Sequence, residues 1–388
     1  MLRLGGSMMI DQTLLRRLAG FDSGTGAVTS VMLCVDGARY RTRDEYLTAL
    51  KALLGQARQE FREWYSDRSL GQSLEEDVSR IESFVTWEFQ RGAYRGLAIW
   101  CQSSAEFWEV LPLRWAPRDE ILVDRYPLLR QLVRCLNSRR NAILLLLERA
   151  AARILTVRQG VVDDELEITS DVPSQVREGG FQGFAERRIS RHVDEHVSRH
   201  LQKVAAEVRQ LVDRHQAGEV LVGGSESVVA WFCDSAAHWV PGVCVRPVEL
   251  SFAQDVRAVD EYLERLDAAE NLEREKKLLE QWAKARASGL AVAGAIPTLR
   301  CLQRGQVDTL LLENDYRQQG WRCEGCGLLT TENGPECPLC QGHMVLLADM
   351  GNAALCAALR QGCNVEVIER LDPGESWGGM ASILRFPL

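Results

Sequence analysis

Four cysteines near the C-terminal end of the sequence have the spacing of a metal site. In WRCEGCGLLTTENGPECPLCQGH, Cys323 and Cys326 form one Cys-x-x-Cys pair, and Cys337 and Cys340 form a second pair after ten intervening residues. Each pair bends the chain so that two sulfurs point at one ion, and four thiolates with no open position are typical of structural zinc. A chance group of free thiols is the weaker interpretation at such a specific spacing, and His343 is near enough to replace a ligand. The sequence therefore predicts one structural zinc held by these four cysteines.

A glycine-rich segment in the middle of the chain is the second candidate. In VREGGFQGFAERR, residues 176–188, Gly179, Gly180 and Gln182 stand directly ahead of a charged, helix-forming run. Glycine accepts backbone angles and close approaches that other side chains forbid. From composition alone the simpler interpretation is favoured, in which the glycines form a turn before a helix and the amide is merely exposed.

Three histidines of the following run recur every four residues. His192, His196 and His200 would line one stripe of a helix, where imidazoles can hold a metal. Cationic neighbours disfavour a bound cation, and the arginines among these histidines are Arg187, Arg188, Arg191 and Arg199. We therefore predict a solvated, partly basic face that could rest on phosphates, with Arg187, Arg188 and Arg191 as its RNA contacts.

Length and composition limit the class of protein. With 388 residues, 46% hydrophobic and 26% charged, the chain is long enough for two or three compact domains. A net charge of −8 argues against a general nucleic-acid coat, although a local basic patch is compatible with it. The longest apolar run, Ala142 to Leu147, is too short to span a bilayer, and we expect a cytoplasmic protein without disulfides or membrane contacts. No Ser-His-Asp order, phosphate-binding loop or paired-carboxylate motif stands out, which lowers the expectation of an ordinary metabolic enzyme.

The hydrophobic pattern predicts three α/β domains in tandem, at 1–136, 137–272 and 273–388. In the first, a strand at 28–36 precedes helical runs at 41–65 and 73–92, the second behind a serine typical of a helix start, and a hairpin at 95–113. In the second, two buried strands within 142–160 and an acidic strand at 163–170 precede a helix over 184–215, a strand at 219–224 and a helix over 253–286. In the third, helices and strands alternate around a zinc-ribbon-like insertion at 319–346.

The order of these parts resembles the archaeal and eukaryotic class-one peptide-chain release factors, in a bacterial, Pelota-like form. The strand pair, the acidic strand, the Gly-Gly-x-Gln loop, FAERRISRHVDEHVSRHLQKVAAEV and a strand ending in LVGG are similar to the family's middle domain. LQRGQVDTLLLE, the four-cysteine insertion, ALRQGCNVEVIERL and WGGMASILRF look like its C-terminal domain, where archaeal members carry a zinc mini-domain. VTSVMLCVDGARYRTRDEYLTALKALL with RGLAIWC is similar to bacterial members. The resemblance covers most of residues 27–388.

The resemblance implies a protein that enters the ribosomal A site, with rRNA and peptidyl-tRNA as partners and a translational GTPase as a candidate for its delivery. It implies that Gly179, Gly180 and Gln182 reach the peptidyl transferase centre, where the glutamine helps to place a water on the ester carbonyl. Such a step depends on positioning and needs no base with a tuned pKa.

The sequence departs from the family at two points, and these departures define the alternatives. Phe181 separates Gly180 from Gln182, whereas the family tripeptide is contiguous, and the first domain lacks the Asn-Ile-Lys-Ser and Tyr-x-Cys-x-x-x-Phe patterns that read stop codons. We therefore expect hydrolysis of peptidyl-tRNA in ribosome rescue without stop-codon reading, slightly ahead of non-catalytic occupation of resting ribosomes in hibernation. A zinc-containing RNA-binding module outside translation is the third alternative.

Overall fold

The computed structural model describes residues 10–21, 23–24, 26–64, 68–170, 183–332, 334, 336–369 and 378–387. Its contacts divide the chain into two compact units. The first unit combines Met1–Ser138 with Leu272–Leu388, and the second is Arg139–Asn271. The structure is of the mixed α/β class, as predicted. The three-domain division stays a prediction about independently folding parts.

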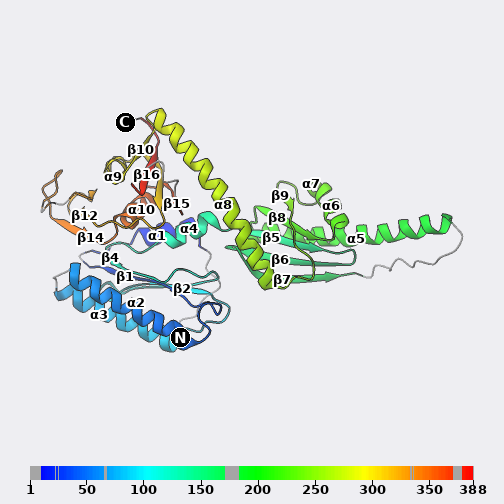
Figure 1. Cartoon of the computed structure of the whole chain (residues 1–388), viewed down its shortest axis with the longest axis horizontal. Coiled ribbons are helices and arrows are strands. Elements are labelled where there is room, and N and C mark those ends of the chain that lie inside the picture. The colour runs from blue at the N-terminus through cyan, green and yellow to red at the C-terminus, as the bar shows by residue number, and fades with distance from the viewer. Residues whose placement is uncertain are drawn as a thin grey trace. The chain divides into compact units, whose positions relative to one another are not determined.

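The N-terminal part of the first unit is built on an antiparallel sheet of order β3-β2-β1-β4 (Figure 1). All residues of β1 and β2 are buried because both faces of the sheet are covered. The elements are α1 (Gln12–Ala19), β1 (Val28–Cys34), α2 (Arg43–Trp64), α3 (Arg68–Ser83), a π-helical turn (Phe84–Glu88), β2 (Gly96–Gln102), a 3-10 turn (Ser103–Ala105), β3 (Phe107–Leu113), β4 (Glu120–Asp124) and α4 (Arg130–Ser138).

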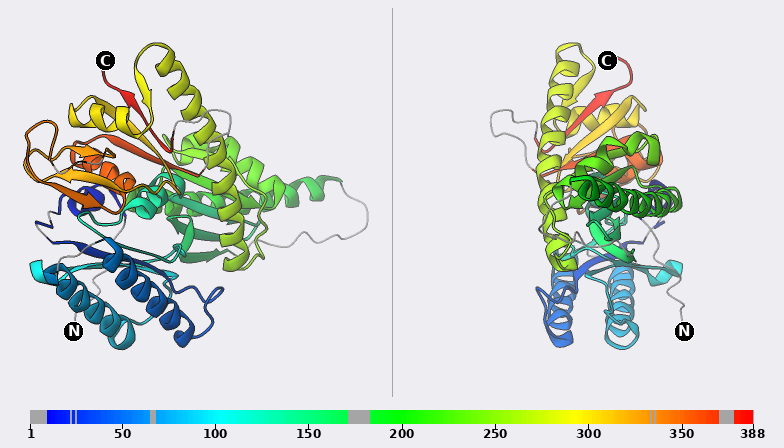
Figure 2. Two further views of the ribbon diagram at one scale, coloured as in Figure 1. Left: turned by 60° about the vertical axis from the view of Figure 1, so that its left-hand side comes forward. Right: turned by 90° about the vertical axis from the view of Figure 1, so that its right-hand side faces the viewer.

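Helices α2 and α3 cover one face of this sheet and lie side by side (Figure 2). The predicted start of α3 at Ser73 is wrong, because the helix already begins at Arg68. Gly71 lies against the Phe61 ring, so α3 packs on α2 before Ser73 is reached. The Ser73 hydroxyl is therefore not an N-cap and lies 3.3 Å from the Ser104 hydroxyl.

The C-terminal part of the first unit has a four-stranded sheet of order β10-β16-β11-β15, in which only β11 and β15 are parallel neighbours. Helices α9 and α10 pack into the same hydrophobic core as α1 and α4, so the two parts of this unit share one core. Trp282, near the end of α8, is buried with strand residues such as Leu311 and Ala381. The elements are α8 (Val256–Ala287), β10 (Ala291–Ala293), α9 (Ala295–Gln303), β11 (Val307–Glu313), β12 (Gly320–Cys323), β13 (Leu329–Thr330), β14 (Met344–Leu347), α10 (Met350–Arg360), β15 (Asn364–Ile368) and β16 (Met380–Leu384).

The second unit is a five-stranded sheet of order β7-β6-β5-β8-β9 between helices. Helix α5 lies on one face, where Leu201, Val204 and Val208 are buried, and the first half of α8 lies on the other, where Val259 and Leu263 are buried. The elements are β5 (Ala142–Leu147), β6 (Ala151–Arg158), β7 (Val161–Thr169), α5 (Gly183–His215), β8 (Glu219–Gly224), α6 (Glu226–Asp234), α7 (Ala236–Trp239) and β9 (Cys244–Pro247).

Candidate functional site

The four predicted cysteines lie in a small antiparallel ribbon of order β13-β12-β14, inserted between β11 and α10. Cys323 ends β12, Cys326 follows it in a turn, and Cys337 and Cys340 belong to a second turn ahead of β14. An isolated bridge between Glu336 and His343 closes the second turn, and the Glu324 amide of the first turn donates to the His343 carbonyl at 3.0 Å, so the two turns lie beside each other.

The sulfur atoms of these cysteines all lie within 4.8 Å of one another, and together they could hold a metal ion. The Cys323 sulfur is 3.4 Å from that of Cys340, and the Cys326 sulfur is 3.6 Å from that of Cys337. Each turn therefore contributes one partner to each close pair. In a tetrahedral zinc site with Zn–S bonds of about 2.3 Å, sulfurs lie about 3.8 Å apart, so the arrangement is close to what such a site requires.

The backbone of the two turns repeats the same geometry. The amide of Gly327 donates to the Cys323 carbonyl at 3.0 Å, and the amide of Gln341 donates to the Cys337 carbonyl at 2.9 Å. Gly327 and Gln341 occupy equivalent positions and both have positive φ, 73° and 58°. The tight reversal needs a left-handed residue after each Cys-x-x-Cys pair, and glycine meets that need without strain at the first turn only.

Backbone amides also point at the sulfurs. Cys326 N–H donates to the Cys323 sulfur and Leu339 N–H to the Cys337 sulfur, both at 3.4 Å. The hydrogen bond from Cys326 N–H, with others at the same sulfur, lowers the pKa of Cys323 to about 6, whereas burial raises the pKa of Cys326. Such donors favour thiolate over thiol, and thiolate is the form that binds metal.

Neighbouring groups agree with a closed four-sulfur site. A Cβ atom at Gly342 would lie 3.2 Å and 3.3 Å from the Cys323 and Cys340 sulfurs, so a side chain here would crowd the cluster. His343, which could have replaced a ligand, is largely exposed and its Nδ1 lies 3.2 Å from a Glu324 carboxylate oxygen. Among the described residues, the four cysteines alone form a group suited to a metal.

The predicted loop Gly179, Gly180 and Gln182 lies outside the described residues. Arg187, Arg188 and Arg191 are on α5, but their side chains also lie outside the described part. The structure therefore does not test the prediction that these three arginines contact RNA.

The segments that flank this loop are anchored to each other by a histidine. His200 of α5 is 2% exposed, and its Nδ1 is 2.9 Å from the hydroxyl of Ser170, the residue after β7. The predicted solvated face is wrong for His200, because this turn of α5 packs on β5 and β6. Burial also lowers the pKa of His200.

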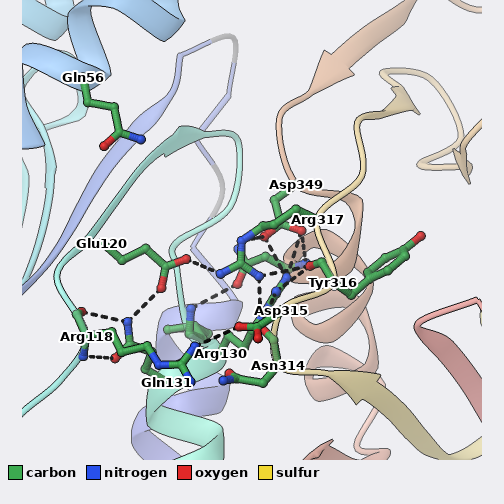
Figure 3. Close-up of polar contacts among 12 residues, drawn as sticks. Gln56, Arg118, Glu120, Arg130, Gln131, Asn314, Asp315, Tyr316, Arg317 and Asp349 are labelled. Carbon is green, nitrogen blue, oxygen red and sulfur yellow. Dashed lines mark hydrogen bonds and ion pairs between the residues drawn. The ribbon is translucent and has the colours of Figure 1, made fainter. Parts of the chain in front are cut away.

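A polar network that was not predicted from the sequence joins the N- and C-terminal parts of the first unit (Figure 3). Arg130 of α4 is fully buried and forms two hydrogen bonds, 2.9 Å and 2.7 Å, with the Asp349 carboxylate. It also donates to the carbonyls of Asn314 and Tyr316. Because the guanidinium is paired and used as a backbone donor, this network is a structural contact between α4 and the start of α10.

A second buried arginine lies in the second unit. Arg140, just before β5, bonds Asp267 at 2.5 Å, Glu219 at 2.9 Å and Glu270 at 2.8 Å. Arg246 pairs with the same two glutamates. The network ties α8 to the edge of the sheet where β5 and β8 begin.

Comparison with known proteins shows which proteins this chain is similar to. Residues 127–270 match the model of "Bacterial archaeo-eukaryotic release factor family 10". The matched segment contains β5 to β9, α5 and the Gly-Gly-Phe-Gln loop. This segment of the chain is similar to the archaeo-eukaryotic release factors.

Two archaeal release factors illustrate how far the similarity extends. The chain is 26% identical over 277 residues to "Peptide chain release factor subunit 1" of Pyrococcus abyssi, and the match covers 63% of this chain and 66% of that protein. It is 33% identical over 130 residues to the protein of the same name from Archaeoglobus fulgidus, covering 29% and 32% of the two chains. The chain thus spans just under two thirds of the length of the first of these relatives.

A solved structure of an archaeal translation termination factor, aRF1, is 17% identical and covers 96% of each chain, with a TM-score of 0.25. That score is too low to support an argument from superposition. In the present chain, the described residues include no helix that is long and apolar enough to cross a membrane.

Proposed function

We propose that the protein binds the ribosomal A site and hydrolyses the ester bond of peptidyl-tRNA during ribosome rescue. The observation that carries the proposal is the family match over residues 127–270, which contains Gly179, Gly180 and Gln182. The relatives are named as peptide chain release factors, and the family resemblance implies that the glycine and glutamine residues of this loop act in release.

The elements around the loop support this function. Helix α5 begins at Gly183, one residue after Gln182, and runs for 33 residues. Its later turns are buried against the sheet through Leu201, Val204 and Val208. The loop sequence is therefore attached to a helix whose base is fixed, and fixed support is what catalysis by positioning requires.

In this proposal the protein does not read stop codons. The first part of the chain has no Asn-Ile-Lys-Ser sequence. We therefore propose that the protein acts on ribosomes whose A site is empty, independently of the codon presented there.

The test uses ribosomes that carry labelled peptidyl-tRNA and an empty A site. Gln182→Ala is expected to reduce the release rate about 100-fold, the effect of losing the positioning of one reactant. Gln202→Ala is the matched control, since Gln202 is an exposed glutamine of α5, the helix that follows the loop, and it should release at the native rate. Native release in Gln182→Ala would contradict the hydrolytic role of this residue.

Phe181 favours one second candidate, in which the protein occupies resting ribosomes without catalysis. The extra residue between Gly180 and Gln182 moves the amide one position along the chain. In that case the native protein binds vacant ribosomes but releases no peptide. Deletion of Phe181, which makes the tripeptide contiguous, would then create release activity. If the native protein releases peptide, this second candidate fails.

We propose that the metal of the ribbon is zinc, bound by Cys323, Cys326, Cys337 and Cys340. The proposal rests on four thiolate ligands in two equivalent turns. When bound, zinc would act as a structural ion, because four sulfurs leave no position for water or substrate.

A further inference from the structure

One large aromatic side chain of the N-terminal part points away from the core. Trp87 is 83% exposed, more than any other large hydrophobic side chain among the described residues. It lies in the π-helical turn that follows α3, where Phe84 and Val85 are buried on the opposite side. Phe89 N–H donates to the Phe84 carbonyl at 2.9 Å, so the backbone beneath the indole is fixed.

The neighbours of this turn pack its base, the Phe84 side. The Phe84 ring packs edge-on against Trp108, with ring centres 5.4 Å apart, and Arg80 lies over the same Trp108 ring at 4.6 Å. Trp87 is thus an exposed flat ring on a packed base. A π-helical turn of this kind costs hydrogen-bond geometry and is often found at functional positions.

Two loops with many arginines meet at the same end of the sheet. Cys34, the last residue of β1, pairs with Gly96, the first residue of β2, so the segments after β1 and before β2 are neighbours. The Arg91 guanidinium donates to the Tyr40 carbonyl at 2.9 Å. We call residues 36–43 and 87–95 together the arginine-rich end. It lies where α2 begins, at Arg43, and where α3 ends, at Ser83.

The arginine-rich end holds more arginines than acidic residues within its own bounds. It contains five arginines, Arg39, Arg41, Arg43, Arg91 and Arg95, against two acidic residues, Asp36 and Glu88, while Asp44 and Glu45 follow directly in α2 and Asp119 pairs with Arg39.

Pairing leaves two of these cations available. Arg95 bonds Asp36 at 2.7 Å, and Arg39 pairs with Asp119 at 2.9 Å. Arg41 and Arg43 are exposed and make no ion pair within the part of the chain that the structure describes. Glu45, the nearest glutamate to them in sequence, accepts from the Arg41 backbone amide.

We propose that the arginine-rich end binds single-stranded RNA, with one base stacked on Trp87 and phosphates paired with Arg41 and Arg43. A base offers a π-face to the indole, and the adjoining phosphates offer charge to the guanidinium groups. An acidic peptide would satisfy the arginines alone and would leave the exposed indole unused. The surface is far in sequence from the release loop, and its RNA binding does not depend on the proposed hydrolysis.

The test measures binding of a labelled ten-nucleotide oligouridylate to the full-length protein at several salt concentrations. Trp87→Ala is expected to weaken binding about 5- to 100-fold and to leave the salt dependence unchanged, because stacking is lost while the phosphate contacts remain. Arg41→Gln with Arg43→Gln should lower the slope of log K against log salt by about 1.4, since single strands lose about 0.7 per phosphate contact.

Matched controls come from exposed residues elsewhere. Trp231→Ala changes a partly exposed tryptophan of α6, and Arg257→Gln changes an exposed arginine of α8. Both should bind RNA as the native protein does, and unchanged thermal unfolding would show that all variants fold. The proposal is overturned if the native protein does not bind this RNA at low salt, or if Trp87→Ala binds as tightly as Trp231→Ala.

The same variants separate this inference from the proposed function. In the release assay, Trp87→Ala should need a higher concentration of protein to reach half-maximal rate, with the rate at saturation unchanged. A native protein that binds the oligonucleotide but releases no peptide would refute the hydrolysis and leave the RNA surface standing.

Discussion

Asp124, the last residue of β4, is a carboxylate with no exposed surface. One of its oxygens accepts the Arg125 amide at 2.7 Å, and the other accepts the Asp349 amide at 3.0 Å. Burial raises the pKa of Asp124 to about 7, because these two amides do not replace the hydration that a charged carboxylate loses. The residue therefore couples the stability of the first unit to pH.

The direction of this coupling follows from the raised pKa. Since the folded state holds the proton more tightly than the unfolded chain, the stabilisation is complete below about pH 4 and is lost as pH rises through 7. Between pH 5 and 8 the free energy of unfolding of the first unit should fall by about 3 kcal/mol through this residue. Urea unfolding at several pH values measures the slope, and Asp124→Asn should reduce it, with the remainder due to Asp349, where burial raises the pKa to about 6. An equal slope in the variant would show that other groups titrate.

At the scale of residues, the sequence predicted the metal ligands but missed the buried arginines. Cys323 and its three partners are found by spacing, because both turns are local in the chain. Arg130 and Asp349 are 219 residues apart. Neither carries a local signal, since a buried arginine looks like a surface arginine until its partner is known.

At the scale of elements, the proposed zinc site of the ribbon predicts how many thiols per chain react rapidly. Of the twelve cysteines, Cys244, Cys326 and Cys340 are exposed. With zinc bound, Cys326 and Cys340 are ligands, so one thiol per chain should react rapidly with a thiol reagent. After a chelator has removed the zinc, three thiols per chain should react rapidly. Rapid reaction of three thiols before chelation would contradict a bound metal.

Metal content provides the second measurement on the ribbon. The purified protein should carry about one zinc per chain, and Cys337→Ser should carry none, since three thiolates bind far more weakly than four. Cys244→Ser, an exposed cysteine of β9 outside the ribbon, is the control and should retain the metal. Equal zinc in both variants would place the ion elsewhere.

The elements that the sequence predicted are those with long, regular patterns. The run at 184–215 has apolar residues at helical spacing and becomes α5, and the run of six apolar residues at 142–147 becomes the fully buried β5. Short elements without a period of their own, such as β9, α7 and the π-helical turn, were not predicted. The extra residue of a π-helical turn depends on packing against Trp108, which sequence pattern does not encode.

At the scale of the whole molecule, the first unit depends on contacts between distant parts of the chain. Arg130→Met would leave the Asp349 carboxylate buried without its guanidinium, at a cost of about 3–5 kcal/mol in the free energy of unfolding. Amide hydrogen exchange in α4 and α10 should become faster, while exchange in α5 of the second unit should not change.

A control for this prediction is Arg118→Met. Arg118 pairs with Asp315 at 2.8 Å, also between the two parts, but both side chains are mostly exposed. Exposed pairs contribute about 1 kcal/mol or less. If the two variants lose the same stability, the buried network is not what holds the parts together.

The grouping of the N- and C-terminal parts into one unit could not be predicted from the sequence. Hydrophobic periodicity shows which face of a helix is buried but not what covers it. Helix α1 packs on α10, and Arg360 of α10 donates to the Phe21 carbonyl at 2.7 Å. Such pairing between the two ends of the chain is visible only in three dimensions.

The position of β16 between β10 and β11 has a consequence for synthesis. Among the described strands it is the last to leave the ribosome, yet its neighbours on both sides have emerged long before. The second unit is complete once residue 271 has emerged and can fold while translation continues. The C-terminal sheet of the first unit, of order β10-β16-β11-β15, cannot form completely until Met380–Leu384 has emerged. During that interval β10 and β11 present unpaired edges, and nascent chains truncated before β16 should be substrates for chaperones and proteases.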